Sequence, residues 1–567
     1  GFSQDHLTLQ KEAEDLFNKD DTESALAIGE SALNMAEVTV GKSHVDYADI
    51  LCDVAVYNAY SGNFEKAISQ MEESLAIFQN LKIESSKEYC EAEGSYATVL
   101  YASGDFVLSE QRWKKAVEMS NYFYGNDSKE YAIALSNLGV VQQIGLNNPS
   151  AAEKNLLIAK SILEKRKMQD SIDYSSMLNN LANVYLDLGD FLKAEQYFKD
   201  AAKTDKRAGR ENTIGYTTYI QNLGFLYLKM GRLDDAKAMM LKDMAMKENI
   251  AGENSIEYAA ALNNFSELQV QLGNYSEGEK YQLNAMKIKE KTIGTKHPDY
   301  LTSENNLASI YFNLGRIEES FVIMRKIMTE VESGKIANPL NYAFYASNLA
   351  VYCSKVNKIE EAEKYYKEVI EIYKDQYGET YGDYTEALNG WAMVALSNNN
   401  KKLAREILQK VIEITRKADM YDSPDNIPVL NNLSVVYQAE NNFEMATKTM
   451  RKVVGIAKDY YGEKHPEYNF LLFNLALYVE QENRNNLEAE QLYTKVIETD
   501  FFNMENSFSY LSESEKASYL STVTKHFDAF FRFILYVYTT NPDILSKTLN
   551  YRLATKAMLL NLSLIHI

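Results

Sequence analysis

Asparagine recurs in this sequence at an almost constant interval and is its most regular polar feature. We call this set the asparagine ladder: Asn137, Asn180, Asn222, Asn264, Asn306, Asn348, Asn432 and Asn474. Successive members are 43, 42, 42, 42, 42, 84 and 42 residues apart, and Gly390 takes the place that divides the interval of 84. An amide side chain both donates and accepts hydrogen bonds, so a row of amides can hold a peptide backbone without reading its side chains.

The ladder also has a purely structural interpretation, in which each side chain bonds to a neighbouring helix or caps a contact between repeats. The two roles are compatible. If a ligand backbone is held, each amide contributes about 0.5–1.5 kcal/mol. Micromolar affinity needs about 8 kcal/mol before ordering costs, so several amides must act together. The stripe is extended less regularly by Asn179, Asn263, Asn305 and Asn431.

Other chemically active residue types lack the spacing that catalysis or metal binding requires. The three cysteines are far apart, which predicts buried free thiols: Cys52, Cys90 and Cys353. Three histidines share one loop position in different repeats, which indicates a structural role: His44, His297 and His465. No Ser-His-Asp or Cys-His set can be assembled. We therefore expect no catalytic residues, no metal and no cofactor in this chain.

The elements that position the ladder recur with the same period. An anchor residue, Gly or small and polar, is followed two places later by Phe, Tyr, Leu or Ile, and five places later by Ala, Ser or Gly. The anchors are Asp20, Gly62, Gly104, Gly145, Gly189, Gly231, Gly273, Gly315, Asn357, Asn399, Asn441 and, more loosely, Asn483. Their spacing is 42 residues except for one step of 41 and one of 44 around Gly145, where residues 147–149 are inserted. The pattern predicts twelve units.

Each unit has the pattern of two amphipathic helices. In the unit around Gly189, apolar residues recur at helical spacing over residues 174–188 and again over 191–201. The glycine between them suits the left-handed position that ends a helix, and asparagine is the next-best residue there. A recurring alanine lets the two helices approach closely: Ala25, Ala67, Ala194, Ala236, Ala362, Ala404, Ala446 and Ala489. Stacked hairpins of this kind form a solenoid.

The signature Leu181-Ala182, Tyr185, Gly189-Asp190-Phe191, Ala194, Phe198, Ala201 resembles the tetratricopeptide (TPR) repeat. The helix entry His297-Pro298-Asp299-Tyr300 and the core Leu178-Asn179-Asn180-Leu181-Ala182 resemble the TPRs of kinesin light chain. The resemblance covers roughly residues 5–500. It implies an all-α, right-handed α-solenoid of about twelve hairpins, with the ladder facing a concave groove that binds a protein or peptide partner. It implies recognition rather than catalysis.

Residues 501–567 depart from the 42-residue period, and Asn550–Asn561 resemble the helical connector of bacterial TPR–CHAT proteins. In that family the connector leads to a caspase-like CHAT protease, whose catalytic residues would lie beyond Ile567, so none is carried over. The resemblance implies a bacterial chain, truncated before a CHAT domain that it binds or regulates. Two alternatives stay open. The chain could be a stand-alone scaffold without a protease, or it could be an enzyme in its own right. Residues 1–4 resemble the tail of a bacterial export signal, so periplasmic and cytoplasmic locations both stay open.

Composition limits the classes of partner. The chain has 567 residues and a formal charge of −21, with no Lys/Arg-rich run. Nucleic-acid grooves and anionic lipid surfaces are both recognised through clustered cations. No apolar run approaches the roughly 18 residues that span a bilayer. The sequence therefore predicts no nucleic-acid partner and no membrane partner.

Overall fold

The computed structural model describes residues 5–17, 21–146, 148–333, 339–379, 382–417, 421–482, 487–507, 513–537 and 551. These residues are almost entirely helical and contain no strand, which confirms the predicted all-α class. None of the helices in these ranges is long and apolar enough to cross a membrane.

The elements follow in order: α1 (His6–Phe17), α2 (Thr22–Thr39), α3 (Val45–Tyr60), α4 (Phe64–Asn80), α5 (Lys87–Ser103), α6 (Phe106–Tyr124), α7 (Lys129–Val140), the π-helical turn η1 (Val141–Gly145), α8 (Pro149–Lys165), α9 (Ile172–Asp187), α10 (Phe191–Arg207), α11 (Ile214–Lys229), α12 (Leu233–Ala251), α13 (Ile256–Gln271), α14 (Tyr275–Thr292), α15 (Pro298–Asn313), α16 (Ile317–Glu332), α17 (Pro339–Lys355), α18 (Ile359–Tyr377), α19 (Gly382–Ser397), α20 (Lys401–Lys417), the 3₁₀ turn η2 (Pro424–Asn426), α21 (Ile427–Ala439), α22 (Phe443–Tyr461), α23 (Pro466–Glu482), α24 (Leu487–Ser507) and α25 (Glu513–Val537).

Helices α1 to α24 pair into twelve hairpins, as the repeat period predicts. The left-handed anchors are confirmed at six of the seven glycines, with φ of +77° at Gly189, and at three asparagines with φ of +63°, +58° and +61°: Asn357, Asn399 and Asn441. These residue types bear that conformation at the smallest steric cost, so each turn is fixed locally. The first and last anchors, Asp20 and Asn483, lie outside the described residues.

The prediction of a left-handed turn is wrong at Gly145. Helix α7 instead passes into the π-helical turn η1, and Gly145 does not have a positive φ. A Cβ at this position would lie 2.6 Å from the ring of Phe106, so close packing rather than backbone conformation requires the glycine.

The core lies between the two helices of each hairpin and between neighbouring hairpins. All eight recurring alanines predicted at the hairpin contact are completely buried. Tyrosines near the start of the first helices pack between units, as in the cases of Tyr47, Tyr384 and Tyr468, which are at most 4% exposed. Buried apolar surface is therefore continuous from one unit to the next, which is what a solenoid needs for stability.

The first helix of each hairpin lies on the inner side of the solenoid. Successive first helices touch one another: α3 contacts α5, α7 contacts α9, and α19 contacts α21. Among the described helices, no two successive second helices make comparable contact. Since the closely spaced row must lie on the side of smaller radius, the first helices line the concave face.

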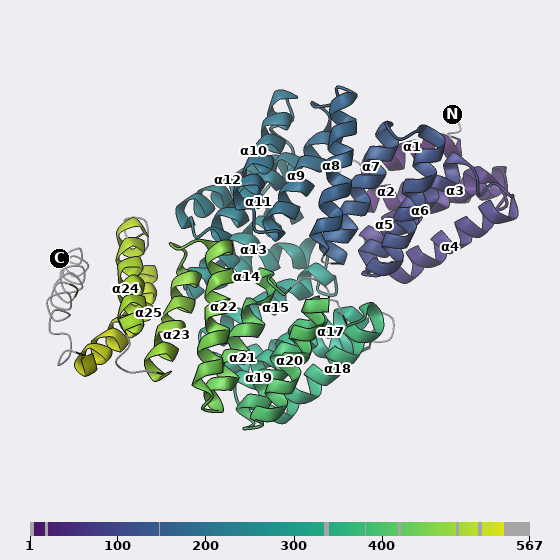
Figure 1. Ribbon diagram of the computed structural model, residues 1–567. Coiled ribbons are helices and arrows are strands. Elements are labelled where there is room, and N and C mark those ends of the chain that lie inside the picture. Colours follow the sequence, from purple (N-terminus) through teal and green to yellow (C-terminus); the bar gives the residue numbers. More distant parts are fainter. Residues whose placement is uncertain are drawn as a thin grey trace.

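The solenoid coils so tightly that hairpins six units apart touch. Figure 1 shows α15–α23 as a second tier below α1–α12. The anchor turn of the second unit meets the start of the eighth, where Pro298 lies 4.0 Å from the Cβ position of Gly62. In the same way the fifth unit meets the end of the eleventh. There the Tyr460 ring packs on Gly189 and lies 5.1 Å, centroid to centroid, from Phe191.

A histidine strengthens this contact between tiers. The ring nitrogen Nδ1 of His465 accepts a hydrogen bond from the backbone N–H of Glu467 at 3.1 Å, which caps α23. The other nitrogen, Nε2, therefore carries the proton and donates to the backbone carbonyl of Lys229 at 2.9 Å. His44 and His297 cap their helices in the same way, so the structural role predicted for these loop histidines is confirmed.

The predicted boundary at residue 500 falls within α24, and α25 continues the packing of the last hairpin. Phe527, Phe530 and Phe533 of α25 belong to the same buried cluster as α23 and α24. The segment Asn550–Asn561 lies outside the described residues, apart from Tyr551. Residues 501–567 as a separate connector stay a prediction.

Replacing Tyr460 with alanine should open the coil without unfolding its repeats. The ring contacts residues of the other tier, whereas each hairpin is held by its own neighbours. We expect an increased radius of gyration by small-angle X-ray scattering and an unchanged far-ultraviolet circular dichroism spectrum. Tyr122→Ala is the matched control, because Tyr122 lies near the end of another second helix and is 82% exposed. An unchanged radius for Tyr460→Ala would contradict the role of this contact.

Candidate partner-binding groove

The asparagine ladder lies on the first helices and is half-buried at all eight positions. Helical spacing and the repeat period place one member on the same turn of each of these helices. The ladder therefore forms a single stripe along the inner side of the coil. Because each side chain is neither fully buried nor fully exposed, both the structural and the ligand-binding interpretation are physically open to it.

Four ladder asparagines hydrogen-bond to the preceding unit. The Nδ2 atoms of Asn222, Asn348 and Asn432 donate to the Oδ1 atoms of Asn179, Asn305 and Asn389 at 2.8, 3.2 and 2.9 Å. Asn180 donates to Ser136 Oγ at 3.4 Å. In each case the acceptor stands one place before the ladder position of the preceding unit. These amides link successive first helices, as the structural interpretation expects.

The other four ladder members behave differently. Within the described ranges, the side chains of Asn137, Asn264, Asn306 and Asn474 make no hydrogen bond to the protein. Next to Asn264, it is Asn263 that bridges to the following unit, donating to Ser303 Oγ at 2.9 Å. The amides of Asn264 and Asn306 therefore remain available in adjacent units.

The single break in the ladder has a steric cause. Gly390 replaces an asparagine because the Tyr366 ring fills that space, and a Cβ there would lie 2.5 Å from it. Its neighbour Asn389 instead accepts the bond from Asn432, a role that the ladder spacing alone does not reveal. The sequence does contain a sign of this role, because asparagine also occupies the place directly before the ladder position at Asn179, Asn305 and Asn431.

In the second unit the ladder place is occupied by Asp53. The amide of Gln10 in α1 donates to Asp53 at 2.8 Å and to Asp49 at 2.9 Å. Burial raises the pKa of Asp53 to about 7, with a further contribution from the charge of Asp49. The groove therefore begins with a carboxyl group that is largely protonated in weak acid, and sequence spacing based on asparagine missed it.

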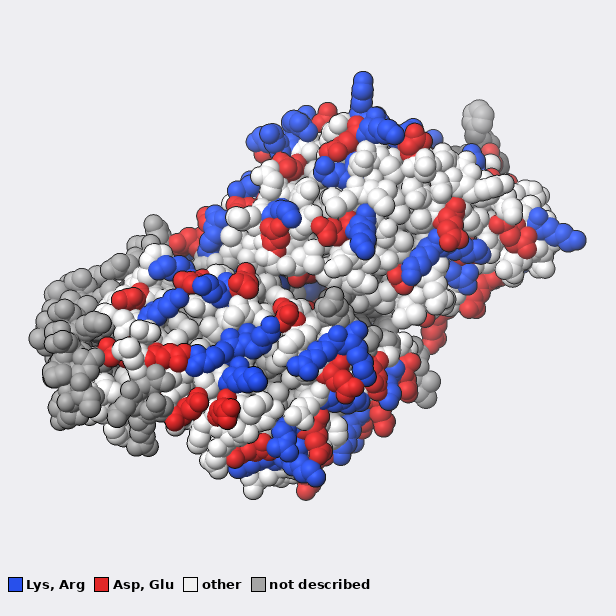
Figure 2. Space-filling view, in the orientation of Figure 1, with Lys and Arg blue, Asp and Glu red and all other residues white. Residues whose placement is uncertain are grey.

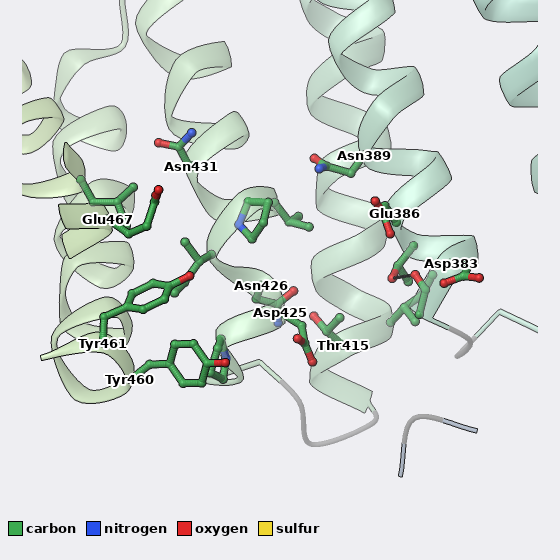
Figure 3. A pocket seen from close by; sticks show the side chains of 18 of the residues that line it. Asp383, Glu386, Asn389, Thr415, Asp425, Asn426, Asn431, Tyr460, Tyr461 and Glu467 are labelled. Atoms are coloured by element: carbon green, nitrogen blue, oxygen red, sulfur yellow. Dashed lines mark hydrogen bonds between the residues drawn. The ribbon is translucent and has the colours of Figure 1, made fainter. Parts of the chain in front are cut away.

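A pocket lies at the inner face of α19, α21 and α23, with a volume of about 630 Å³. We call it the inter-turn pocket because Lys229, from the other tier, also lines it. Figure 3 shows Asp383, Glu386 and Asn389 on α19, with Asp425 and Asn426 on η2. Tyr460 and Tyr461 close one side from the end of α22. Asn389 and Asn431, which stand directly before the ladder positions of their units, both line this pocket.

In the described part of the chain, possible metal ligands are not clustered and the thiols are buried. No group of three or more His, Cys, Asp or Glu residues among the described residues is arranged to hold a metal ion. The three cysteines are buried, and burial raises the pKa of each thiol, to about 12 for Cys353, so the nucleophilic thiolate is disfavoured. The predicted free thiols are thus confirmed.

Charge on the visible outer surface is mixed. Figure 2 shows Lys and Arg interspersed with Asp and Glu over both tiers. Many carboxylates of second helices are paired: Glu195 lies 2.6 Å from the Lys199 ammonium, and Glu279 lies 2.8 Å from the Arg316 guanidinium. These charges cancel locally and present no extended cationic field on this face.

Comparison with known proteins agrees with the repeat architecture. A tetratricopeptide repeat family model matches residues 5–80, 173–249, 257–328 and 340–417, more than half of the chain, and a second tetratricopeptide repeat model matches 429–467. No curated protein sequence matches the chain.

Solved structures with a similar arrangement include BtubC (BKLC) from P. vanneervenii, 20% identical, covering 41% of this chain and 92% of that chain with a TM-score of 0.35. Nearly identical TPR-like repeats of a putative kinesin light chain from Podosopora anserina are 18% identical and cover 36% of this chain and 97% of that chain, with a TM-score of 0.32.

Replacing Asp53 with asparagine should stabilise the protein at high pH. The folded carboxyl has a pKa near 7, above the value of about 3.9 for an unfolded chain, so folding binds protons between these values. Stability supplied by Asp53 therefore falls as the pH rises from about 4 to about 7. At pH 8, Asp53→Asn should raise the free energy of unfolding by about 1–3 kcal/mol.

At pH 4 the variant and the parent should differ little, because the folded carboxyl is then neutral. Urea unfolding followed by circular dichroism at both pH values checks this expectation. Glu84→Gln, which removes an exposed carboxylate, is the control and should shift neither midpoint. Equal stabilisation by Asp53→Asn at pH 4 and pH 8 would contradict the assigned protonation.

Proposed function

Because this chain belongs to the tetratricopeptide repeat family, we propose that its concave groove binds an extended segment of a protein partner. The general role of a protein-interaction scaffold follows from the repeat architecture itself. Such a solenoid offers a long inner surface built from one helix per unit. The chain thus acts by binding and needs no chemistry of its own.

The observation that carries this proposal is the pair Asn264 and Asn306. They stand on the adjacent first helices α13 and α15, are half-exposed, and have no hydrogen-bond partner among the described residues. Amides used only to join the helices would be paired, as Asn222 is with Asn179. An amide that donates and accepts matches both polar groups of a peptide bond.

Replacing both Asn264 and Asn306 with alanine should weaken peptide binding without unfolding the array. The probe is a fluorescent peptide selected on the intact chain from a library of random twelve-residue peptides and measured by fluorescence anisotropy. Loss of two hydrogen bonds at about 0.5–1.5 kcal/mol each gives roughly a 5- to 150-fold rise in Kd. Helix content and the unfolding midpoint should stay at parental values.

The matched control is Asn222→Ala, which removes a ladder amide that is already bonded within the protein. This change leaves the Asn179 Oδ1 atom without its donor, so it should lower stability more than it affects binding. If Asn264→Ala/Asn306→Ala binds the selected peptide as tightly as the parent does, the amides do not hold a ligand. The groove mechanism would then be abandoned.

We further propose that the array regulates a caspase-like CHAT domain in its parent protein. Support comes from the resemblance of Asn550–Asn561 to the connector of TPR–CHAT proteins and from the attachment of α25. Asp500 on α24 accepts hydrogen bonds from Asn469 on α23 at 2.8 Å and from His526 on α25 at 2.9 Å. These buried bonds tie α25 to the last hairpin, so a change in coil curvature moves it too.

The parent open reading frame beyond Ile567 tests the regulatory proposal. A caspase-like domain encoded there is the expected result, and its peptidase activity should change at least severalfold when the selected peptide fills the groove. A stop codon close to this position, or an activity that does not respond to the peptide, would overturn the proposal. In the first case the chain would be a stand-alone scaffold.

A further inference from the structure

The described lining of the inter-turn pocket is rich in hydrogen-bond acceptors. Among the described residues that line it, the charged ones are four acids, Asp383, Glu386, Asp425 and Glu467, and one base, Lys229. Three of these acids form no ion pair with any described Lys or Arg: Glu386, Asp425 and Glu467. Crowding by the surrounding protein raises the pKa of Glu386 and of Glu467 above the ordinary value, although both remain accessible at the mouth.

A second, independent feature is an amide that lacks a donor. Asn431 lines this pocket, and its Oδ1 atom is buried and has no hydrogen-bond partner in the described part of the chain. Its neighbour Asn389 already uses Oδ1 to accept from Asn432. A buried acceptor without a donor costs roughly 1–3 kcal/mol, so this site gains from a guest that donates.

Aromatic rings complete the pocket. Tyr460 and Tyr461 stand with their centroids 4.8 Å apart at 72°, and both line the cavity. The face of an aromatic ring attracts a cation within about 6 Å, and an arginine guanidinium also stacks on it. Carboxylates, an amide oxygen and aromatic rings therefore all favour one kind of guest, a cationic group that carries only donors.

Carboxyl groups without a basic partner recur on the inner face, although some first-helix acids are paired, as Glu93 is with Arg112. On second helices, many acidic side chains have basic partners in the same or an adjacent unit, as Glu195 has with Lys199 and Arg232. On first helices, several carboxyl groups have pKa values raised mainly by burial and no ion pair to a described Lys or Arg: Asp49, Asp53, Glu91, Asp187, Glu267, Glu386 and Glu467. The uncompensated negative charge thus lies where a partner would bind.

We propose that the inter-turn pocket binds an arginine side chain of the partner segment that occupies the groove, held by Glu386, Glu467 and the Asn431 amide and packed against Tyr461, of which one face is stacked on His465. This assignment rests on the proposed function, since it names the chemistry of the partner for the same groove. Arginine suits the pocket better than lysine because its planar guanidinium has five donors and no acceptor. An acidic segment is disfavoured, because it would bring like charge against the four acids.

The test measures a fluorescein-labelled Gly/Ser peptide that carries two arginines, at about 0.15 M salt, where distant charges are screened. Glu386→Gln/Glu467→Gln in the intact chain should raise its Kd at least tenfold. Lys229→Gln should have the opposite effect and lower the Kd two- to threefold, because it removes the one base found among the described lining residues. The backbone carbonyl of Lys229, which holds His465, is unaffected by this change.

Glu84→Gln/Glu118→Gln is the control, because it removes the same charge from exposed positions outside the pocket. Its Kd should stay within twofold of the parental value. An equal loss of binding in the two double variants would show that the peptide responds only to net charge and would overturn the assignment. So would tighter binding of a peptide in which lysine or glutamate replaces both arginines.

The outcomes for the pocket and for the groove can be told apart. If the arginine peptide does not bind, while a library-selected peptide still depends on Asn264 and Asn306, the proposed function stands and the pocket assignment falls. If neither peptide binds, both are overturned. Circular dichroism of each variant confirms that the helices persist, so that loss of binding is not loss of fold.

Discussion

A single helical hairpin cannot cover its own apolar faces, and the structure depends on this constraint. Each unit leaves two surfaces that only neighbouring hairpins can bury, so the chain must repeat the same geometry along its length. The completely buried alanines show how close that packing is: at Ala194 or Ala446, a larger side chain would force the helices apart. Regular stacking in turn aligns equivalent residues into stripes on the inner face.

The coil adds contacts that a simple stack does not have. Because hairpins six units apart meet, Tyr460 and His465 bind residues that belong to the preceding turn. Lys229 from the other tier supplies one wall of the cavity beside them, so the cavity is complete only while the two tiers are in contact. Occupancy of the pocket and curvature of the solenoid are thereby coupled, since a ligand that binds only the closed form must favour that form. This coupling offers a physical route from groove to α25.

Polar groups on the inner face divide into those that build the groove and those that remain available. The bonds from Asn222 to Asn179 and from Asn432 to Asn389 are part of the framework, while Asn264 and Asn306 have no partner among the described residues. Buried polar groups are normally satisfied, so an unpaired amide in an accessible stripe is informative in a way that a paired one is not. The same reasoning applies to carboxylates, which are often paired on second helices, whereas Glu386, Asp425 and Glu467 in the pocket form no ion pair with a described Lys or Arg.

Sequence by itself determined the class, the period and the local turns, because these depend on short-range rules. Helical spacing of apolar residues, the left-handed tolerance of glycine and asparagine at positions such as Gly189 and Asn399, and the need for alanine at the hairpin contact can all be read along the chain. Tertiary structure alone decided which ladder members pair, why Gly145 is required, and that Asn389 and Asp53 belong to the groove. It also brought Lys229 to His465, which stand 236 residues apart. The physical reason is that coil pitch is the sum of small rotations between units, and no residue spacing specifies that sum.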